Sequence, residues 1–205
     1  MTTKLSAGPV LAATLFTALL LAGCASAPTG PRSTAAVAPY RETIKLDGRL
    51  NVNYRKDDKP ESITVNFDWR QQGARTDVTL MAPPLGQIVA TVSVTPEQAT
   101  LTQGGKPPRS APDIDTLSAQ VLGWSLPVSG LRDWLQGYAT GADGQRFVAT
   151  PANDSVVTRD GWRLHYVSWQ DETAAVPQPK RIDASRSGGG QVDDMAIRIV
   201  IDATQ

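Results

Sequence analysis

The sequence contains very little of the residue types on which disulfides, metal sites and most catalytic centres depend. Its 205 residues include one cysteine and one histidine. A disulfide within the chain, a cysteine-based zinc cluster and a multi-histidine metal site are therefore excluded. The 20 basic and 20 acidic side chains cancel, so the basic excess typical of a nucleic-acid-binding protein is also missing. From these absences we expect no catalytic residues, no metal, no cofactor and no nucleic-acid partner.

The N-terminal residues have the pattern of an export signal. Lys4 is the only charge before Arg32, and residues 9–22 are a run of Ala, Leu, Val, Thr and Phe. Such a run is too short for a comfortable membrane span but has the length of a signal-peptide core. It ends in Leu21-Ala22-Gly23-Cys24, which resembles a bacterial lipobox. An ordinary signal peptide with an incidental cysteine is the alternative.

The lipobox resemblance implies that residues 1–23 are a lipoprotein signal peptide that is removed. It also implies that Cys24 receives diacylglycerol on its sulfur, and that the new amine is acylated. Ala25 rather than Asp follows the cysteine, and in enterobacteria-like sorting this implies export to the outer membrane. Several acyl chains, at about 0.8 kcal/mol for each buried methylene, would hold the protein there almost irreversibly.

Residues 24–39 read as the acylated cysteine followed by a flexible tether. The segment is rich in Ala, Ser, Thr, Pro and Gly, with Arg32 as its single charge. We expect nothing in it to pack a core. A globular domain is predicted to occupy residues 40–205.

The first half of this domain alternates apolar and polar residues with the period of two that is typical of half-buried strands. The apolar positions are Leu46, Gly48, Leu50, Val52 and Tyr54, then Ile63, Val65, Phe67 and Trp69, then Thr76, Val78 and Leu80, then Ile88, Ala90, Val92 and Val94. A weaker strand spans about 98–102. Short polar turns separate the strands, so the pattern predicts an antiparallel meander.

The pattern then changes to helical spacing twice, over 113–123 and over 129–137. Strands are predicted to resume near 146–148, 155–158, 162–169, 180–185 and 195–201. The expected fold class is mostly β with a few helices that lie as a lid over the apolar face of the sheet. If the helices fill that face the result is a packed core, and if they do not, an apolar cavity remains.

Several segments that follow one another in a fixed order resemble the LolB family of outer-membrane lipoprotein receptors. They are Gly48-Arg49-Leu50, Phe67-Asp68-Trp69-Arg70-Gln71-Gln72, Pro84-Leu85-Gly86, residues 126–137 and Gly161-Trp162-Arg163-Leu164-His165-Tyr166. The resemblance covers about 46–201. It implies an open, half-closed antiparallel β-barrel with a short helical lid and a hydrophobic cavity between the two.

The resemblance also implies a function and a set of partners. Members of the family take acylated lipoproteins from the soluble periplasmic carrier LolA and release them into the outer-membrane lipid. Acyl chains are costly to expose to water, so a receptor that binds them more tightly than the carrier, and less tightly than the bilayer, passes them on without ATP. We expect a monomer, anchored in the outer membrane and facing the periplasm, that is not an enzyme.

The side chains that would line an acyl-chain cavity are apolar or aromatic residues at strand and helix spacing. We predict this set to comprise Leu50, Val52, Tyr54, Val65, Phe67, Trp69, Leu80, Trp124, Leu131, Trp134, Trp162 and Tyr166. By spacing alone, aromatic residues at such positions are more often plain core, and only the resemblance gives the cavity equal weight. The spacing leaves both interpretations open.

Leu85 is more informative, because a turn between two strands seldom carries a large apolar side chain at its tip. It lies between Pro84 and Gly86, and the resemblance implies a protruding loop with a hydrophobic residue at this place. We predict that this loop enters the membrane while cargo is released. The alternative is that Leu85 folds back onto the body of the protein.

Other patterns favour ordinary interpretations. His165 with Ser168 or Asp160 would be needed for a hydrolase relay, but the sequence has no nucleophile elbow. The pairs Asp57-Asp58 and Asp193-Asp194 are interpreted as solvated turns rather than calcium sites. The rival functions are a structural or assembly lipoprotein that binds no acyl chains, and a general carrier of small apolar ligands.

Overall fold

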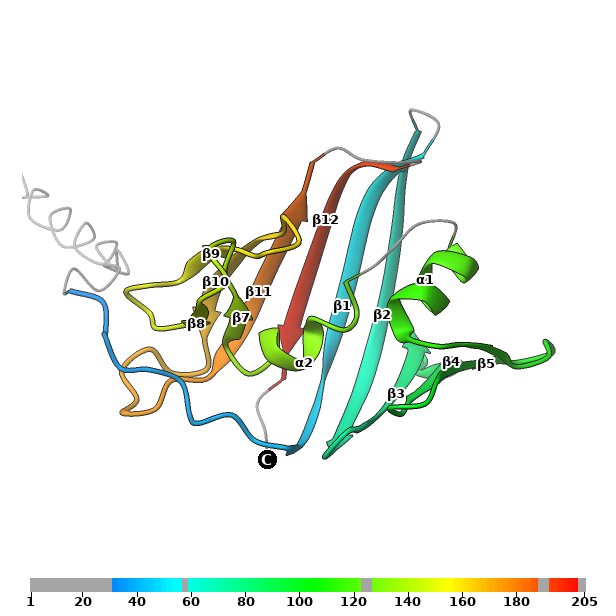
Figure 1. The fold of residues 1–205 in the computed structure, drawn as a ribbon, viewed down its shortest axis with the longest axis horizontal. Helices are drawn as coiled ribbons and strands as arrows, with labels where there is room; N and C mark the ends of the chain where they lie inside the picture. The colour runs from blue at the N-terminus through cyan, green and yellow to red at the C-terminus, as the bar shows by residue number, and fades with distance from the viewer. Residues whose placement is uncertain (1–30, 57–58, 123–126, 188–191, 203–205) are drawn as a thin grey trace, which may run out of the picture. The chain divides into compact units, whose positions relative to one another are not determined.

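One large antiparallel sheet forms most of the part of the chain that the structure describes (Figure 1). The computed structural model describes residues 31–56, 59–122, 127–187 and 192–202. Within them the ten-stranded sheet has the order β6-β5-β4-β3-β2-β1-β12-β11-β10-β9, and a second sheet pairs β7 with β8. The strands are β1 (Thr43–Lys56), β2 (Lys59–Gln72), β3 (Arg75–Ala82), β4 (Gln87–Val94), β5 (Ala99–Gln103), β6 (Arg109–Ala111), β7 (Tyr138–Thr140), β8 (Arg146–Val148), β9 (Ser155–Val157), β10 (Arg163–Trp169), β11 (Pro179–Arg186) and β12 (Val192–Ile201).

The sheet is open, because its two edges, β6 and β9, lie at opposite ends of the strand order. The predicted fold class is therefore confirmed as a mostly β, open antiparallel sheet with short helices. β1 to β6 follow one another as a meander, as the alternation predicted. The last four strands join this meander through β12, which pairs with β1.

The register places the apolar positions of neighbouring strands side by side on one face, here called the inner face. Leu50 of β1 lies opposite Val65 of β2, and Phe67 of β2 lies opposite Leu80 of β3. Gly48 is the position on this face where β1 lies between Phe67 and Ile201. Because strand side chains alternate, a single apolar face follows directly from the period-two sequence.

Two helices, α1 (Ile114–Leu122) and α2 (Leu131–Trp134), lie on the inner-face side of the sheet (Figure 1). Asp113 caps α1, since the backbone N–H of Thr116 donates to its Oδ1 at 2.7 Å, and this bond lowers the pKa of the Asp113 carboxyl. α1 packs against β5 and β6. α2 is shorter than the predicted 129–137.

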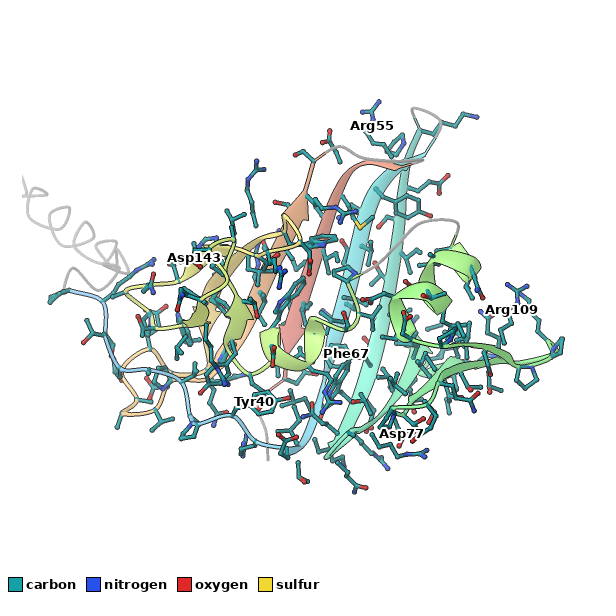
Figure 2. All side chains as sticks on the ribbon, in the orientation of Figure 1. Tyr40, Arg55, Phe67, Asp77, Arg109 and Asp143 are labelled. Atoms are coloured by element: carbon teal, nitrogen blue, oxygen red, sulfur yellow. The ribbon has the colours of Figure 1, made fainter. Side chains whose placement is uncertain are left out.

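The buried apolar side chains form two clusters on the inner face. The larger one combines β1, β2 and β10 to β12 with α2, and includes Phe67, Trp69 and Trp134. The smaller one combines β4, β5 and β6 with α1, and includes Leu117. Leu80 of β3 packs against both clusters. Figure 2 shows side chains filling the space between the sheet and the helices.

The segment predicted to be a tether is part of the body from Arg32 onward. Val37 is buried in the larger cluster, and its backbone N–H donates to the carbonyl of Ala149 at 3.3 Å. The Tyr138 hydroxyl donates to the carbonyl of Ala38 at 2.6 Å. The expectation that nothing before Tyr40 packs a core is therefore wrong for residues 32–39. The composition gave a wrong prediction for this segment, because one buried valine and a few backbone hydrogen bonds are enough to hold an extended chain against the domain.

Shortening the side chain of Val37 to alanine is expected to destabilise the domain by about 1 to 2 kcal/mol, because a buried side chain loses two methyl groups. Gly137 lies directly beneath, where a Cβ would stand 2.7 Å from Val37 Cγ1. Urea denaturation of the variant measures the effect, with Ala36→Gly at the neighbouring exposed position as control. Equal midpoints for Val37→Ala and the unaltered chain would show that the docking is energetically unimportant.

Candidate functional site

The inner face contains a strip of apolar side chains that the two helices cover only in part. Of the predicted cavity residues, Leu50, Tyr54, Val65, Leu80 and Leu131 are half-buried, and their neighbours Ile63 and Val92 are half-buried too. The strip crosses β1 to β4 between the two packed clusters. Leu50, Tyr54, Leu80 and Leu131 pack against the larger cluster on one side and keep part of their surface exposed. A partly exposed apolar surface of this kind is suited to bind an apolar chain.

The other predicted cavity residues lie in the core. Val52, Phe67, Trp69, Trp134, Trp162 and Tyr166 are all buried. Trp124 lies outside the described residues. The structure thus divides the predicted set: Tyr54 and the aliphatic members other than Val52 form the half-buried strip, and the described tryptophans belong to the larger packed cluster.

Aromatic rings pack tightly below α2. Trp134 and Trp162 have ring centroids 6.1 Å apart, and Tyr166 stacks on Trp169 at 6.0 Å. The Tyr166 hydroxyl donates to the backbone carbonyl of Trp134 at 3.3 Å, which ties the helix to β10. A cavity of about 190 Å³ next to the two tryptophans is also lined by Asp133.

Burial changes the pKa values of two titratable groups near this cavity. It raises the pKa of the half-buried Asp133 carboxyl, against the opposing effect of the Arg146 and Arg132 guanidinium groups. Burial also raises the pKa of the Tyr166 hydroxyl, which therefore stays protonated and serves as a donor. The Arg186 guanidinium lies over the ring of Trp162, 5.1 Å from its centroid.

Polar contacts hold α2 at one end of the inner face. Arg132 donates to the carbonyl of Gly73 at 2.6 Å and to that of Ala74 at 3.1 Å, and these two residues form the turn between β2 and β3. The Asp115 carboxylate of α1 accepts hydrogen bonds from the backbone N–H and the hydroxyl of Ser129. The two helices are thus linked to each other as well as to the sheet.

Replacing Arg132 with alanine is expected to loosen α2 while the sheet remains folded. The helix loses two charge-assisted hydrogen bonds, and amide hydrogen exchange at Trp134 and Leu135 is expected to accelerate by about tenfold. Arg109→Ala, at an exposed position in β6, is the matched control. If protection at Trp134 and Leu135 is unchanged, the clamp between α2 and the β2–β3 turn does not restrain the helix.

Two polar side chains lie on the inner face, Gln71 and Thr76, and the sequence analysis gave neither of them a functional role. Gln71 and Thr76 are almost completely buried and lie directly opposite each other on β2 and β3. The sequence did indicate that they are unusual, because both occupy inward positions of the alternating pattern, where apolar residues are expected. A buried polar residue is an exception to the rule that apolar residues fill the core, and it therefore points to a specific role.

The loop between β3 and β4 presents its apolar side chain to solvent. Leu85 is 92% exposed, and Ile88 and Val89 at the start of β4 are exposed large hydrophobic residues as well. Gly86 has φ of +71°, and its N–H donates to the carbonyl of Ala82 at 3.0 Å. The turn therefore holds Leu85 outward, and the alternative that it folds back onto the body does not apply to this structure.

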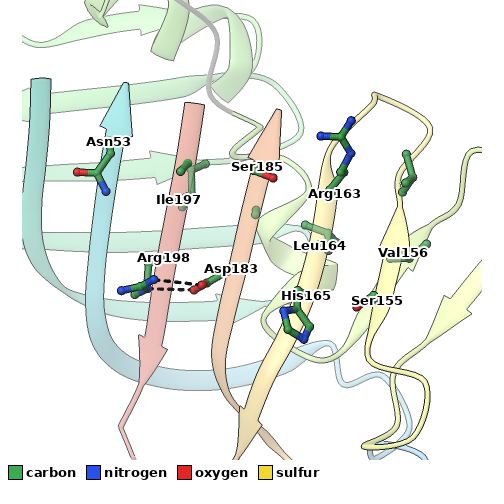
Figure 3. A pocket seen from close by; sticks show the side chains of 13 residues that line it. Asn53, Ser155, Val156, Arg163, Leu164, His165, Asp183, Ser185, Ile197 and Arg198 are labelled. Atoms are coloured by element: carbon green, nitrogen blue, oxygen red, sulfur yellow. Dashed lines mark hydrogen bonds and ion pairs between the residues drawn. The ribbon is translucent and has the colours of Figure 1, made fainter. Parts of the chain in front are cut away.

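The opposite, outer face contains a groove of about 660 Å³ over β1 and β9 to β12, lined by apolar and polar residues together (Figure 3). Burial works to raise the pKa of Asp183, but hydrogen bonds from Arg181 and Arg198 outweigh it and hold the pKa below its usual value. His165, also in this groove, has its Nε2 atom 3.6 Å from Asp154 Oδ2, and Asp154 forms an ion pair with Arg32 at 2.6 Å. The neighbour of His165 is thus Asp154, and not Ser168 or Asp160, the residues that a hydrolase relay would have required.

Membrane-spanning helices and metal sites are two further features that a functional site could include. Within the described ranges, no helix has the length and apolar character needed to span a membrane. The same ranges hold no group of three or more side chains suited to a metal ion. Asp57 and Asp58 lie outside the described residues, as do Cys24 and the side chain of Asp193. Asp194 is exposed.

Residues 42–203 match the model of the family described as "Outer membrane lipoprotein LolB". The chain belongs to the LolB family. A relative from Cupriavidus necator, named outer-membrane lipoprotein LolB, is 38% identical over 188 residues, which cover 87% of this chain and 93% of the relative. One of the same name from Ralstonia nicotianae is 39% identical over 191 residues and covers 89% of this chain and 90% of the relative.

Two solved structures resemble this LolB family member more distantly. A LolA superfamily protein from Nitrosomonas europaea has a TM-score of 0.41 and 6% identity, covering 82% of this chain and 87% of that one. A DUF1329 family protein from Desulfovibrio piger has a TM-score of 0.47 and 8% identity, covering 78% and 84%.

Proposed function

We propose that this protein is an outer-membrane receptor that accepts acylated lipoproteins from a LolA-type periplasmic carrier and inserts them into the outer membrane. The observation that carries the proposal is the half-buried apolar strip on the inner face, between the two packed clusters. It offers an acyl chain a surface that is already partly withdrawn from water. The relatives, which are named outer-membrane lipoproteins, support the location.

The energetics of transfer explain why the strip should be only partly covered. Keeping an acyl chain of about 16 carbons in water costs about 13 kcal/mol at 0.8 kcal/mol per methylene. A half-covered face recovers part of this energy, whereas a bilayer recovers nearly all of it. Cargo bound here therefore moves downhill into the membrane, and the transfer needs neither ATP nor a cofactor. In this account the protein is a trafficking factor and not an enzyme.

Two further features fit the same function. The lipobox at Cys24 would anchor the protein in the membrane to which it delivers cargo, while the domain faces the periplasm as a monomer. The exposed loop of Pro84, Leu85 and Gly86 would insert the side chain of Leu85 into that membrane. Anchor and loop together would bring the apolar strip close to the lipid surface.

The experiment that tests this function follows a labelled lipoprotein from the carrier to this protein. Mature protein with Cys24→Ala, which cannot be acylated, is mixed with LolA-type carrier that holds the labelled cargo, and the two proteins are then separated. Movement of label without ATP supports the receptor. Label that stays on a carrier able to unload to another acceptor would favour the structural or assembly lipoprotein.

A further part of the experiment distinguishes the receptor from a general carrier of small apolar ligands. Binding of a free apolar dye without any transfer of lipoprotein would favour that carrier. Leu80→Asp places a charge at the contact between both clusters, on the half-buried strip, and Thr91→Asp places one on the exposed outer side of β4. The receptor requires that the first variant loses the label and the second does not.

A further inference from the structure

Three buried polar atoms on the inner face have no hydrogen-bond partner within the described ranges: Trp69 Nε1, Gln71 Oε1 and Thr76 Oγ1. Their residues are 4%, 0% and 2% exposed. A buried polar group without a partner costs about 1–3 kcal/mol, and such groups are rare in folded proteins.

The three side chains lie together. Gln71 and Thr76 face each other across β2 and β3, and Trp69 pairs with Val78 one inward position farther along. All three side chains therefore point to the inner face at the end of the β2–β3 hairpin, beside the turn that Arg132 of α2 contacts. This end of the sheet adjoins the apolar strip through Val78 and Leu80.

The orientation of Gln71 is fixed by its other amide atom. Its Nε2 donates to the hydroxyl of Tyr40 at 3.0 Å and to the carbonyl of Arg41 at 3.4 Å. The Oε1 atom is thereby directed away from these partners and kept as a free acceptor. The cluster as a whole offers one N–H donor, one carbonyl acceptor and one hydroxyl that can donate or accept a hydrogen bond.

This donor and acceptor pattern is complementary to the linkages that join acyl chains to a lipidated cysteine. Ester carbonyl oxygens accept hydrogen bonds, and the N-acyl amide supplies both an acceptor and an N–H donor. Alkyl chains alone offer neither. A polar cluster at one end of an apolar strip therefore fits a molecule with long apolar chains and a polar head of ester and amide groups.

We propose that Trp69, Gln71 and Thr76 form a polar subsite that binds the ester and amide linkages of the cargo's acylated cysteine. The indole N–H and the Thr76 hydroxyl donate to carbonyl oxygens, and Gln71 Oε1 accepts from the amide N–H. The subsite rests on the proposed receptor function. It becomes accessible when the segments beside it move, namely Tyr40 and Arg41, which contact Gln71, and α2, which contacts the β2–β3 turn. Its three unpaired atoms make the covered state less stable.

The test compares two synthetic lipopeptides with equal chain lengths, one with ester-linked diacylglycerol and one with ether links that lack the carbonyl oxygens. The unaltered protein is expected to bind the ester form about fivefold more tightly for each hydrogen bond gained. Thr76→Val and Trp69→Phe are each expected to reduce ester binding about fivefold and to leave ether binding unchanged. Isothermal titration calorimetry gives both affinities.

A second readout uses the protein without lipid. Because Thr76→Val removes an unpaired buried hydroxyl and keeps the shape, it is expected to raise the melting temperature by about 3 °C while it weakens ester binding. Thr91→Val, on the exposed outer side of β4, is the control and should change neither. A merely structural role for Thr76 predicts the opposite sign, a lower melting temperature.

The outcomes separate the subsite from the receptor function. Equal affinity of the unaltered protein for the ester and ether lipopeptides overturns the subsite and leaves the receptor standing. A Thr76→Val variant that binds the ester form normally overturns it as well. Failure of the unaltered protein to bind either lipopeptide overturns the proposed function, and the subsite with it.

Discussion

Replacing Leu85 with glutamate is expected to leave the protein folded and able to accept cargo but to reduce delivery into membranes by about tenfold or more. The side chain is 92% exposed, so folding does not depend on it. A carboxylate at the loop tip has to be dehydrated to enter the bilayer, whereas leucine enters favourably. Delivery is measured as labelled lipoprotein transferred from the loaded receptor to liposomes, and acceptance as label taken from the carrier.

The control for this prediction is Val176→Glu, in the loop between β10 and β11. Val176 is 48% exposed, so the substitution adds the same charge at another exposed apolar position. Its delivery should match that of the unaltered protein. Normal delivery by the Leu85 variant would show that the loop has no part in release, and a loss of acceptance would place its role at an earlier step.

Replacing Gly48 with alanine is expected to be the most destabilising single methyl addition in the sheet, with a loss of about 4 kcal/mol in the free energy of unfolding. A Cβ at this position would lie 2.1 Å from the backbone oxygen of Val200 and 3.1 Å from Phe67 Cζ. The oxygen belongs to the paired strand β12 and cannot rotate away. The strands would have to separate where β1 joins the two halves of the sheet.

Chemical denaturation measures this loss, with Gly104→Ala as the matched control. Gly104 lies in the turn after β5, where a Cβ would meet nothing within 4 Å, so we expect a change within about 0.5 kcal/mol. If both variants unfold at the same denaturant concentration, β1 and β12 are less closely packed at Gly48 than the structure indicates.

The sequence predicted best those strands whose two faces differ in polarity. In β1 the positions from Leu46 to Tyr54 were assigned to the correct face, because one face contacts the core and the other contacts water. β6 and β7 were missed, because each has only three residues and directly adjoins a segment assigned to a helix or a loop. The pairing of β1 with β12 was also missed, because contacts between distant segments leave no local pattern.

The candidate site could be predicted only in part. Alternation identified the face that bears Leu50, Val65 and Leu80, but coverage by helices decides which of its residues are half-buried and which are core. That coverage depends on the Arg132 and Asp115 contacts, which join segments far apart in the sequence. The unpaired atoms of Gln71 and Thr76 are likewise a property of tertiary packing, although their inward positions were visible in the pattern.

The place of β1 between β2 and β12 also determines when the domain can fold. β1 stands near the start of the chain, and its second neighbour is the last strand to be made. Until β12 arrives, the β1 edge stays unpaired and the larger cluster lacks Ile197, Ile199 and Ile201. Completing the sheet must therefore wait until the whole chain is present. Such a delay would suit the export that the lipobox-like segment at Cys24 predicts, because a polypeptide must cross a membrane before it folds.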